Sequence, residues 1–453
     1  MQMKKYETYK DSGIEWIGEI PATWSMERLR FLGSLYGGLT GKSREDFEVK
    51  EGEEYELFIP FTNIFNNNIL NPNLMQKVKV GKNETQNKVS KGDILFLMSS
   101  EDYDGIGKSS ILDTEFPTLY LNSFCKGFKV KKDLISPYFL NYYLLGNSAR
   151  YQIRKSANGF TRINLKMNGL LDTRICIPTY QEQTTIATYL DHKVACIDKS
   201  VEAINAQIDD LKAYRQSVIS EAVTKGLNPD APMKDSGIEW IGEIPEGWEC
   251  IRLRYLLSTP LLYGASESGD SEHNKYPRYI RITDITEDGK LKEIGAKYLN
   301  PILAAPYMLK KGDILFARSG ATVGKTYFFN ENIDACFAGY LIKATCNGDL
   351  IPKYLFYYTQ SGVYENWKNS MFTQATIQNI GADKYNELPI VLPSIEEQQS
   401  IATYLDTKTA KIDAAIASLE AQKDDLNALK QSVISEAVTG KIDVREWYQG
   451  NAQ

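Results

Sequence analysis

A chain of 453 residues with 43% hydrophobic content fits two to four domains with real cores and excludes a disordered or low-complexity protein. No apolar run reaches a membrane helix of ~18 residues, the first residues lack a signal peptide's apolar region, and the six cysteines form no C-x-x-C pair, so we expect a cytoplasmic protein without zinc or disulfides. The net charge of −6 does not exclude nucleic-acid binding, because residues 22–178 carry 21 basic and 17 acidic side chains and residues 246–393 carry 16 of each.

A twelve-residue segment, KDSGIEWIGEIP, occupies positions 10–21 and returns unchanged at positions 234–245. Two identical dodecamers do not arise by chance, so they indicate a tandem duplication. The segment is interpreted either as a structural plug or as a docking surface displayed twice, and we favour the plug. In that interpretation four apolar side chains pack onto their own domain: Ile14, Trp16, Ile17 and Ile20.

The regions that follow the two dodecamers resemble each other only in outline. The sequence Lys-Gly-Asp-Ile-Leu-Phe at 91–96 recurs at 311–316 and predicts a turn that leads into a buried strand. Other strand-like runs, Gly and Asn turns and short helices predict a mixed α+β domain in each region. A shared scaffold with different surfaces is typical of duplicated domains that each recognise something different.

Apolar residues at alternating steps of three and four predict a long amphipathic helix over 181–224, because this is the heptad pattern of a coiled-coil seam. Thr179 and Glu182 predict a capping box at its start, and Gly226 follows its last turn. At ~1.5 Å per residue the helix is roughly 65 Å long, far longer than a core helix of one globular domain. It therefore requires a partner for its apolar seam.

The predicted partner lies in the same chain, where the pattern repeats 215 residues later. Ser394 and Glu397 rebuild the capping box, Gly440 marks the end, and QSVISEAVT is identical at 216–224 and 431–439. We predict antiparallel pairing, which relates two similar docking surfaces by an approximate two-fold axis. The residues predicted to pair the helices are Ile186, Leu190, Ile197, Val201, Ile204, Ile208 and Leu211 with Ile401, Leu405, Ile412, Ile416, Leu419 and Leu426.

No pattern of residues typical of catalysis or cofactor binding is found. The turn at 320–326 resembles a phosphate-binding loop, but it has one residue too few before Gly-Lys and precedes a strand pattern. A hairpin turn, or a turn that directs Lys325 and its counterpart Lys108 at a phosphate backbone, is favoured instead. The two histidines, His192 and His273, lie in no metal-binding pattern. We therefore expect no catalytic residue, no metal and no cofactor in this chain.

Basic and amide side chains cluster before each long helix. Arg contacts guanine bidentately and Asn contacts adenine, while cations neutralise phosphates. Each residue alone is better explained as solvated surface, but the recurrence of the clusters in both halves favours DNA binding. The candidates of the first half are Lys108, Arg150, Arg154, Lys155, Asn158, Thr161, Arg162 and Lys166. Those of the second half are Arg318, Lys325, Lys368, Asn369, Thr373, Gln374 and Gln378.

The order of dodecamer, variable region and long helix, taken twice, resembles the DNA-specificity (S) subunit of type I restriction–modification systems. The matching residues are the two dodecamers, the Gly-Asp-Ile-Leu-Phe strands, and the Glu182-Gln183 and Glu397-Gln398 pairs that precede Ile-Ala-Thr-Tyr-Leu-Asp. The resemblance implies two target-recognition domains, each reading half of a split double-stranded DNA site. It also implies that the helices bind two methyltransferase (M) subunits, and that restriction (R) subunits join to cleave DNA using ATP.

The predicted fold class is therefore α+β, with two mixed α/β target-recognition domains separated by two long helices that form an antiparallel intramolecular coiled coil, in a pseudo-two-fold tandem duplication. The predicted boundaries are 1–178 for the first repeated segment and recognition domain, 179–226 for the central helix, 227–393 for the second segment and domain, 394–440 for the C-terminal helix and 441–453 for a tail. The alternative is a non-catalytic coiled-coil scaffold with two protein-binding domains. Salt-dependent binding of duplex DNA by the partner-bound complex separates the two hypotheses.

Overall fold

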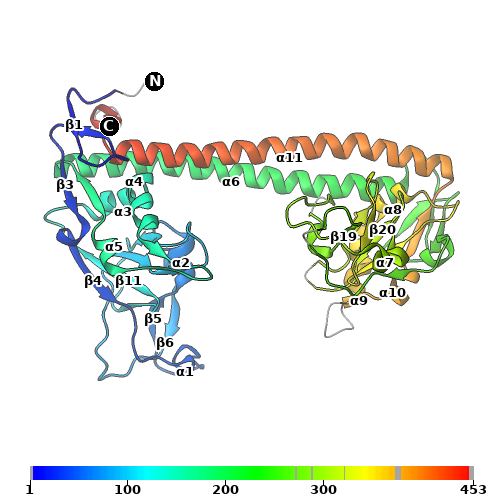
Figure 1. Ribbon diagram of the computed structural model, residues 1–453, viewed down its shortest axis with the longest axis horizontal. Helices are drawn as coiled ribbons and strands as arrows, with labels where there is room; N and C mark the ends of the chain where they lie inside the picture. Colours follow the sequence, from blue (N-terminus) through cyan, green and yellow to red (C-terminus); the bar gives the residue numbers. More distant parts are fainter. Residues whose placement is uncertain (1–3, 271–272, 287–288, 321, 373–378, 448–453) are drawn as a thin grey trace. The chain divides into compact units, whose positions relative to one another are not determined.

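The computed structural model describes residues 4–270, 273–286, 289–320, 322–372 and 379–447. The chain forms two compact units (Figure 1). Unit 1 consists of Met1–Ile204 together with Ala421–Gln453, and unit 2 consists of Asn205–Glu420. Both boundaries fall inside long helices, so each unit contains the beginning of one long helix and the end of the other. Unit 2 is continuous in sequence, whereas unit 1 is assembled from both ends of the chain.

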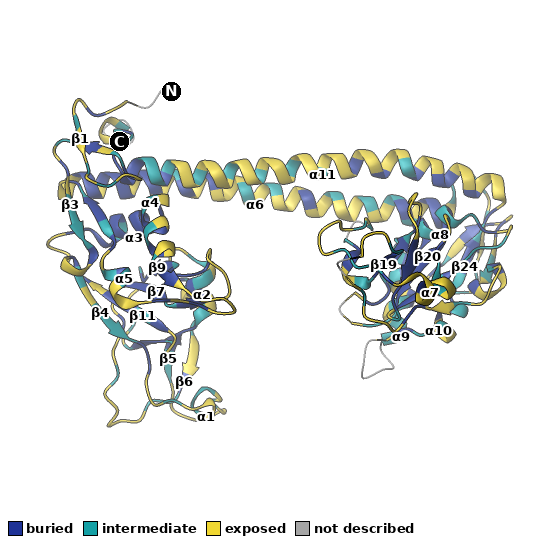
Figure 2. Ribbon diagram, viewed as in Figure 1, coloured by how far each residue is buried: buried dark blue, intermediate teal, exposed yellow. Residues whose placement is uncertain are grey.

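The two long helices are α6 (Tyr180–Lys225) and α11 (Ile395–Val438), as the heptad pattern predicts. Gly226 and Gly440 follow them with φ of +77° and +70°, the left-handed conformation that commonly ends a helix. Of the residues predicted to pair the helices, those nearest the start of each helix are mostly buried, and those further along are mostly half-buried (Figure 2). The buried ones are Ile186, Leu190, Ile197, Ile208, Ile401, Leu405 and Ile412. The half-buried ones are Val201, Ile204, Leu211, Ile416, Leu419 and Leu426.

Ion pairs join the two helices within each unit. In unit 1, Lys430 Nζ lies 2.6 Å from Asp198 Oδ1, and in unit 2, Arg215 Nε lies 2.9 Å from Asp413 Oδ1. Both cationic side chains are well covered, with 15% and 23% of their side-chain surface exposed. The residue numbers of the two pairs, 198 with 430 and 215 with 413, add to the same total.

The domain of unit 1 is built on a four-stranded sheet of order β4-β11-β7-β9. All four residues of β7 (Ile94–Leu97) are buried, and Gly92 in the preceding turn has φ of +91°, so the predicted turn and buried strand are confirmed. Smaller sheets of order β10-β5-β6 and β12-β13-β8 flank it. Its other strands are β3 (Ser25–Arg28), β4 (Gly33–Gly37), β5 (Glu56–Ile59), β6 (Gln76–Val78), β8 (Ser99–Ser100), β9 (Ser109–Ile111), β10 (Leu119–Leu121), β11 (Cys125–Val130), β12 (Ala157–Asn158), β13 (Ile163–Leu165) and β14 (Arg174–Ile177). Its short helices are α1 (Arg44–Phe47), α2 (Phe61–Asn66), α3 (Pro137–Leu145), α4 (Asn147–Lys155) and α5 (Met167–Leu171).

Unit 2 contains the corresponding sheet, of order β18-β23-β20-β21. Here β20 (Ile314–Ala317) is the buried strand, and Gly312 in the turn before it has φ of +97°. The other strands are β17 (Glu249–Arg252), β18 (Leu262–Tyr263), β19 (Arg278–Ile280), β21 (Thr326–Phe328), β22 (Ala335–Phe337), β23 (Leu341–Ala344) and β24 (Pro389–Leu392). The short helices are α7 (Pro301–Ala304), α8 (Pro352–Tyr358), α9 (Gly362–Phe372) and α10 (Ala382–Asn386).

Each dodecamer folds as a small antiparallel hairpin, β1 (Tyr9–Asp11) with β2 (Glu19–Pro21) in unit 1 and β15 (Met233–Asp235) with β16 (Glu243–Pro245) in unit 2. Its second and third isoleucines are buried in the main core of their own unit, which also includes the end of one long helix and the start of the other, and its first isoleucine is half-buried against that core. The tryptophan inside the dodecamer is instead 41% exposed in unit 1 and 38% exposed in unit 2. The plug interpretation therefore holds for Ile17 and Ile20 and in part for Ile14, which is half-buried against the same core. Trp16 contacts Tyr151 of its own domain but stays 41% exposed, so it is not part of the buried plug.

Candidate nucleic-acid interface

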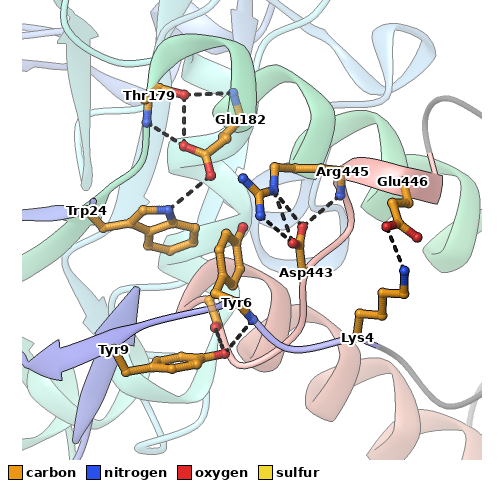
Figure 3. Close-up of polar contacts among 10 residues, drawn as sticks. Lys4, Tyr6, Tyr9, Trp24, Thr179, Glu182, Asp443, Arg445 and Glu446 are labelled. Atoms are coloured by element: carbon orange, nitrogen blue, oxygen red, sulfur yellow. Dashed lines mark hydrogen bonds and ion pairs between the residues drawn. The ribbon is translucent and has the colours of Figure 1, made fainter. Parts of the chain in front are cut away.

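A glutamate at the start of each long helix connects that helix to the segment after the dodecamer. In unit 1, one carboxylate oxygen of Glu182 accepts hydrogen bonds from the backbone and hydroxyl of Thr179, and the other accepts from Trp24 Nε1 at 3.3 Å (Figure 3). In unit 2, Glu397 makes the same contacts with the residue that caps α11 and with Trp248, also at 3.3 Å. Both predicted capping boxes are thus confirmed, and each serves a buried indole as well.

The glutamine that follows each glutamate fixes the next piece of the domain. Gln183 accepts from the backbone N–H of Ser136 at 2.7 Å, and Gln398 accepts from the N–H of Ile351 at 2.8 Å. Ser136 and Ile351 immediately precede α3 and α8, so the Glu-Gln pair places these helices against the long helix. Both glutamine side chains are buried with their amide groups also donating to the proline carbonyl five residues earlier.

A tyrosine on each of these short helices reaches an aspartate of the long helix. Tyr142 on α3 donates to Asp191 at 2.7 Å, and Tyr357 on α8 donates to Asp406 at 2.7 Å. Burial, followed by the neighbouring carboxylate, raises the pKa of both phenols, so they remain neutral donors at physiological pH.

The identical QSVISEAVT segments hold the helix that carries the binding candidates. In unit 1, Ser435 Oγ of α11 accepts from the N–H of Asn147, the first residue of α4, at 2.9 Å. In unit 2, Ser220 Oγ of α6 accepts from the N–H of Gly362, the first residue of α9, at 2.7 Å. Orphan N–H groups at a helix start require an acceptor, and the serine supplies it. The end of one long helix therefore positions α4, and the end of the other positions α9.

Two arginines of α4 are engaged inside unit 1. Arg150 is buried and donates from Nη2 to the carbonyl of Asp104 at 2.8 Å, while Arg154 pairs with the Asp104 carboxylate at 2.7 Å. Burial, and then the charge of Arg154, lowers the pKa of Arg150 to about 10. Arg150 therefore braces the 101–107 loop, and its guanidinium is not presented on the surface.

Lys155 lies at the end of α4 beside exposed aromatic rings. Its Nζ is 5.5 Å from the ring centroid of Trp16 and 5.9 Å from that of Tyr151, and the two rings are 5.1 Å apart. The faces of aromatic rings attract a nearby cation, so the two rings hold the charged end of Lys155 at this surface. The exposed tryptophan of the dodecamer thus adjoins the predicted binding cluster, a relation that the linear sequence does not reveal.

Four further candidates of unit 1 lie on or next to the β12–β13 hairpin. Asn158 and Thr161 are exposed, as is Lys166 just before α5. Arg162 is exposed too, yet it is oriented by a hydrogen bond from Nη2 to Ser99 Oγ at 3.1 Å and by the Phe124 ring, 5.5 Å from its guanidinium carbon. The structure therefore brings these residues together on one hairpin surface.

The glycine-containing turns before Lys108 and Lys325 are hairpin turns. Strand β9 follows Lys108 and pairs with β7, and strand β21 follows Lys325 and pairs with β20, so each lysine precedes a strand and not a phosphate-binding helix. Lys108 Nζ donates to the carbonyl of Phe65 and lies 4.1 Å above its ring, and Lys325 Nζ donates to the carbonyl of Ile285. Burial, followed by the charge of Arg150, lowers the pKa of Lys108.

The candidates of unit 2 are more dispersed. The guanidinium of Arg318 lies 4.9 Å from the ring centroid of Tyr263, Lys368 pairs with Glu365 at 2.6 Å, and Asn369 is exposed. Lys325 and Lys368 line one cavity of about 520 Å³ together with Arg215 of α6. Thr373, Gln374 and Gln378 lie outside the described residues.

Sequence reasoning missed two aromatic side chains next to the hairpin. Phe160, at its tip, has a relative exposure of 103%, and Phe124 is 61% exposed. The spacing of apolar residues cannot separate such exposed rings from core residues. An isolated Phe in a short strand–turn–strand pattern counts as apolar whether its side chain is buried or exposed. The one available signal was the preceding glycine, which marks a tight turn.

Within the described ranges, no three His, Cys, Asp or Glu side chains gather closely enough to hold a metal ion. None of the described helices has the length and hydropathy that a membrane span requires.

A sequence model described as the type I restriction modification DNA specificity domain matches the chain twice, over residues 30–210 and 245–427. The chain belongs to this family. It is similar to the putative type I restriction enzyme MjaX specificity subunit of Methanocaldococcus jannaschii, with 26% identity over 98% of this chain and 99% of that protein. It is also similar to the StySPI specificity subunit of Salmonella potsdam, with 24% identity over 96% of this chain and 92% of the relative.

Among solved structures, a chain from a study of complex assembly and conformational transition of the type I R-M system superposes with a TM-score of 0.66 at 16% identity, covering 93% of this chain and 99% of that one. The fold is therefore shared. Membership in the family makes the chain a DNA-target recognition subunit, and the catalytic activities of such a system lie in other subunits. The mixed helix and strand content and the two specificity domains agree with the predicted α+β class with two mixed α/β domains.

Proposed function

We propose that unit 1 and unit 2 each read one half of a split double-stranded DNA target. The observation that carries this proposal is the recurrence of one set of buried contacts in two units whose outer surfaces differ. The same Glu, Gln, Tyr and Ser contacts hold α3 and α4 in unit 1 and α8 and α9 in unit 2. A constant frame with variable surfaces suits two readers of different half-sites.

The reading residues proposed for unit 1 are those on the hairpin surface, where Arg162, Asn158 and Thr161 face solvent, together with Lys155 and Lys166. Amide and guanidinium groups supply the donor and acceptor pairs that distinguish bases in the major groove. Arg150 is buried, so we propose a structural role for it. It holds the loop whose Asp104 carboxylate pairs with Arg154. In unit 2 the proposed contacts are Arg318, Lys325, Lys368 and Asn369, with Thr373, Gln374 and Gln378 beyond the described residues.

The long helices are proposed to pair as an antiparallel coiled coil and to dock two methyltransferase subunits, through which restriction subunits join. The two ion pairs that share one register support antiparallel pairing. An approximate two-fold relation between the frames would give two copies of one partner the same binding surface. The identical dodecamers, each with an exposed tryptophan, are consistent with that arrangement.

A domain exchange in the assembled complex tests the proposal. Residues 22–178 are replaced by the counterpart of a relative, the chain is combined with its methyltransferase subunit, and methylated sites are sequenced. We expect one half of the methylated sequence to change and the other half to stay, because each unit reads its own half. A change in both halves would contradict the two-reader arrangement.

The salt dependence of binding separates DNA recognition from a protein-binding scaffold. Phosphate neutralisation releases counterions, so the logarithm of the affinity for duplex DNA should fall steeply and linearly with the logarithm of salt concentration. A scaffold of two protein-binding domains would show no duplex binding with this slope.

A further inference from the structure

The tip of the β12–β13 hairpin in unit 1 presents a phenylalanine to solvent. Phe160 has a relative exposure of 103%, so its ring makes essentially no contact that hides it from water. Single exposed apolar residues are common. An aromatic ring that is completely exposed at the tip of a turn, however, can insert into a binding partner.

The backbone that carries Phe160 is held in a defined conformation. Gly159 has φ of +143°, and a Cβ added there would lie 2.1 Å from the carbonyl oxygen of Arg162, so only glycine fits this turn. Asn164 Nδ2 donates to that same carbonyl at 3.1 Å. On the other side β13 pairs with β8, Ile163 lying opposite Ser100. The ring is therefore displayed by a braced hairpin.

The chemistry around the ring suits nucleic acid better than a protein surface. The neighbouring exposed side chains are amides, a hydroxyl and a guanidinium: Asn158, Asn164, Thr161 and Arg162. Arg162 is stacked near Phe124, which leaves its planar face supported and its charge at the surface. The neighbouring 101–104 loop carries three exposed acidic residues, of which Asp104 pairs with Arg154 and Asp102 accepts from the N–H of Gly105. Protein interfaces, in contrast, surround an aromatic anchor with other apolar groups.

We propose that Phe160 is an aromatic wedge that inserts at one base step of the half-site read by unit 1 and partly unstacks it. This inference rests on the proposed reading of one half-site by each unit. Apolar side chains such as Phe that enter between base pairs kink the duplex, and the ring regains by stacking what the bases lose. The flanking amide and guanidinium groups would then be held in register with the base edges beside that step.

The test uses the full chain assembled with its methyltransferase subunit, without methyl donor. The probe is a duplex carrying the sequence that the wild-type complex methylates, with 2-aminopurine placed in turn at each adenine of unit 1's half-site except the methylated one, and at bases flanking that half-site. Unstacking raises 2-aminopurine fluorescence. We expect one position at which wild-type complex raises the fluorescence and the Phe160→Ala complex does not.

Affinity is measured with the same duplex lacking the probe base. Loss of one stacked ring weakens binding by about 5- to 150-fold, from the usual range for a base–aromatic contact. Phe160→Trp should retain both the fluorescence signal and most of the affinity. The matched control is Phe31→Ala, which removes another exposed phenylalanine of unit 1, 54% exposed, and should change neither.

The outcomes separate this inference from the proposed function. If the wild-type complex methylates a bipartite site but Phe160→Ala matches it in fluorescence and affinity, or if no position responds in wild type, the wedge is wrong while the two-reader proposal stands. If Phe160→Ala weakens binding of the methyltransferase subunit in the absence of DNA, the ring belongs to a protein interface and the wedge is again overturned. If the wild-type complex recognises no split DNA site, the proposed function itself fails.

Discussion

Unit 1 and unit 2 use the same internal contacts but are closed in different ways. In unit 2 the chain runs directly from the end of α6 into the dodecamer hairpin at Met233. In unit 1 the dodecamer belongs to the N-terminal segment, and the end of α11 meets it without a covalent connection. The N–H of Asp443 donates to the carbonyl of Lys4 at 2.8 Å, and Lys4 pairs with Glu446 at 2.7 Å (Figure 3). Unit 1 must therefore bring together two segments that lie far apart in sequence, whereas the corresponding segments of unit 2 are adjacent.

The closure of unit 1 adds a small core of its own. Val444 is fully buried and Ile442 is 8% exposed, while Trp447 packs edge-on against Tyr189 of α6 with ring centroids 5.2 Å apart. Tyr9 of the dodecamer hairpin donates to the carbonyl of Gly440 at 3.1 Å. These contacts replace a linker, so the comparison predicts that the C-terminal residues matter for unit 1 alone.

The largest effect of a single substitution is expected from the buried tryptophans that the two units share. Trp24→Ala should lower the free energy of unfolding of unit 1 by about 3–5 kcal/mol, and Trp248→Ala should lower that of unit 2 by the same amount. In each case a large buried ring is replaced by a cavity, and a glutamate loses the indole that donates to it. Hydrogen exchange resolved by segment measures each unit separately. Phe160→Ala, at a fully exposed ring, is the control and should leave exchange nearly unchanged. Equal destabilisation of both units by one substitution would contradict their independence.

Removing residues 441–453 tests the closure of unit 1. The deletion removes the buried side chains of Val444 and Ile442, each of which contributes about 1.5–3 kcal/mol, so unit 1 should lose about 3–6 kcal/mol of unfolding free energy. Unit 2 should keep its stability, since its frame is continuous. The control is Lys4→Ala, which removes only an ion pair with both side chains more than 60% exposed. A loss confined to unit 2 would refute the assignment of these contacts.

The repeated frame could be predicted from the sequence because its parts are local and duplicated. The capping pairs and the Glu182-Gln183 start lie a few residues apart, and the heptad steps read directly as helix. The closure of unit 1 could not be predicted, because contacts between residue 4 and residue 443 leave no periodic signal. The burial of Arg150 was missed for the same reason, since its partner loop lies some 46 positions away. The residue type alone shows that the side chain is cationic. Only the packing of the folded chain decides whether that cation lies on the surface, where DNA could reach it, or is buried against a backbone carbonyl.

The glycines that end the two long helices give a sharper comparison. Gly440 and Gly226 have nearly the same positive φ, so alanine costs a similar backbone strain of about 1–2 kcal/mol at either site. A Cβ at Gly440 would lie 2.3 Å from Pro21 Cδ, whereas at Gly226 it would lie 3.0 Å from Trp248 Cζ2. Gly440→Ala should therefore cost about 1–3 kcal/mol more, the usual cost of overpacking.

Thermal unfolding of the two variants measures that difference. Gly237→Ala supplies the strain-only control, because its φ is also +73° and nothing lies within 4 Å of the added Cβ. If Gly226→Ala lowered the stability more than Gly440→Ala, the closer packing around Gly440 would not be what determines the cost of alanine there.

The smallest effect is expected where the two units pair charges at their surfaces. Asp172 in unit 1 accepts from Arg30 at 2.6 Å and lies 3.5 Å from Arg28, and Glu387 in unit 2 occupies the same place between Arg254 and Arg252. The carboxylates are 47% and 44% exposed, so water and salt screen both clusters. Asp172→Asn and Glu387→Gln should each cost only about 0.2–1 kcal/mol, the range measured for exposed pairs.

Because the two clusters match in geometry and exposure, their losses should be equal and should shrink together as salt is raised. Denaturant unfolding at low and high ionic strength measures both quantities, and the isosteric amides keep the packing unchanged. A much larger loss in one unit would mean that its cluster also orders the neighbouring strand pair, β14 with β3 in unit 1 or β24 with β17 in unit 2. The repeated frame would then depend on surface charge in that unit and on buried contacts in the other.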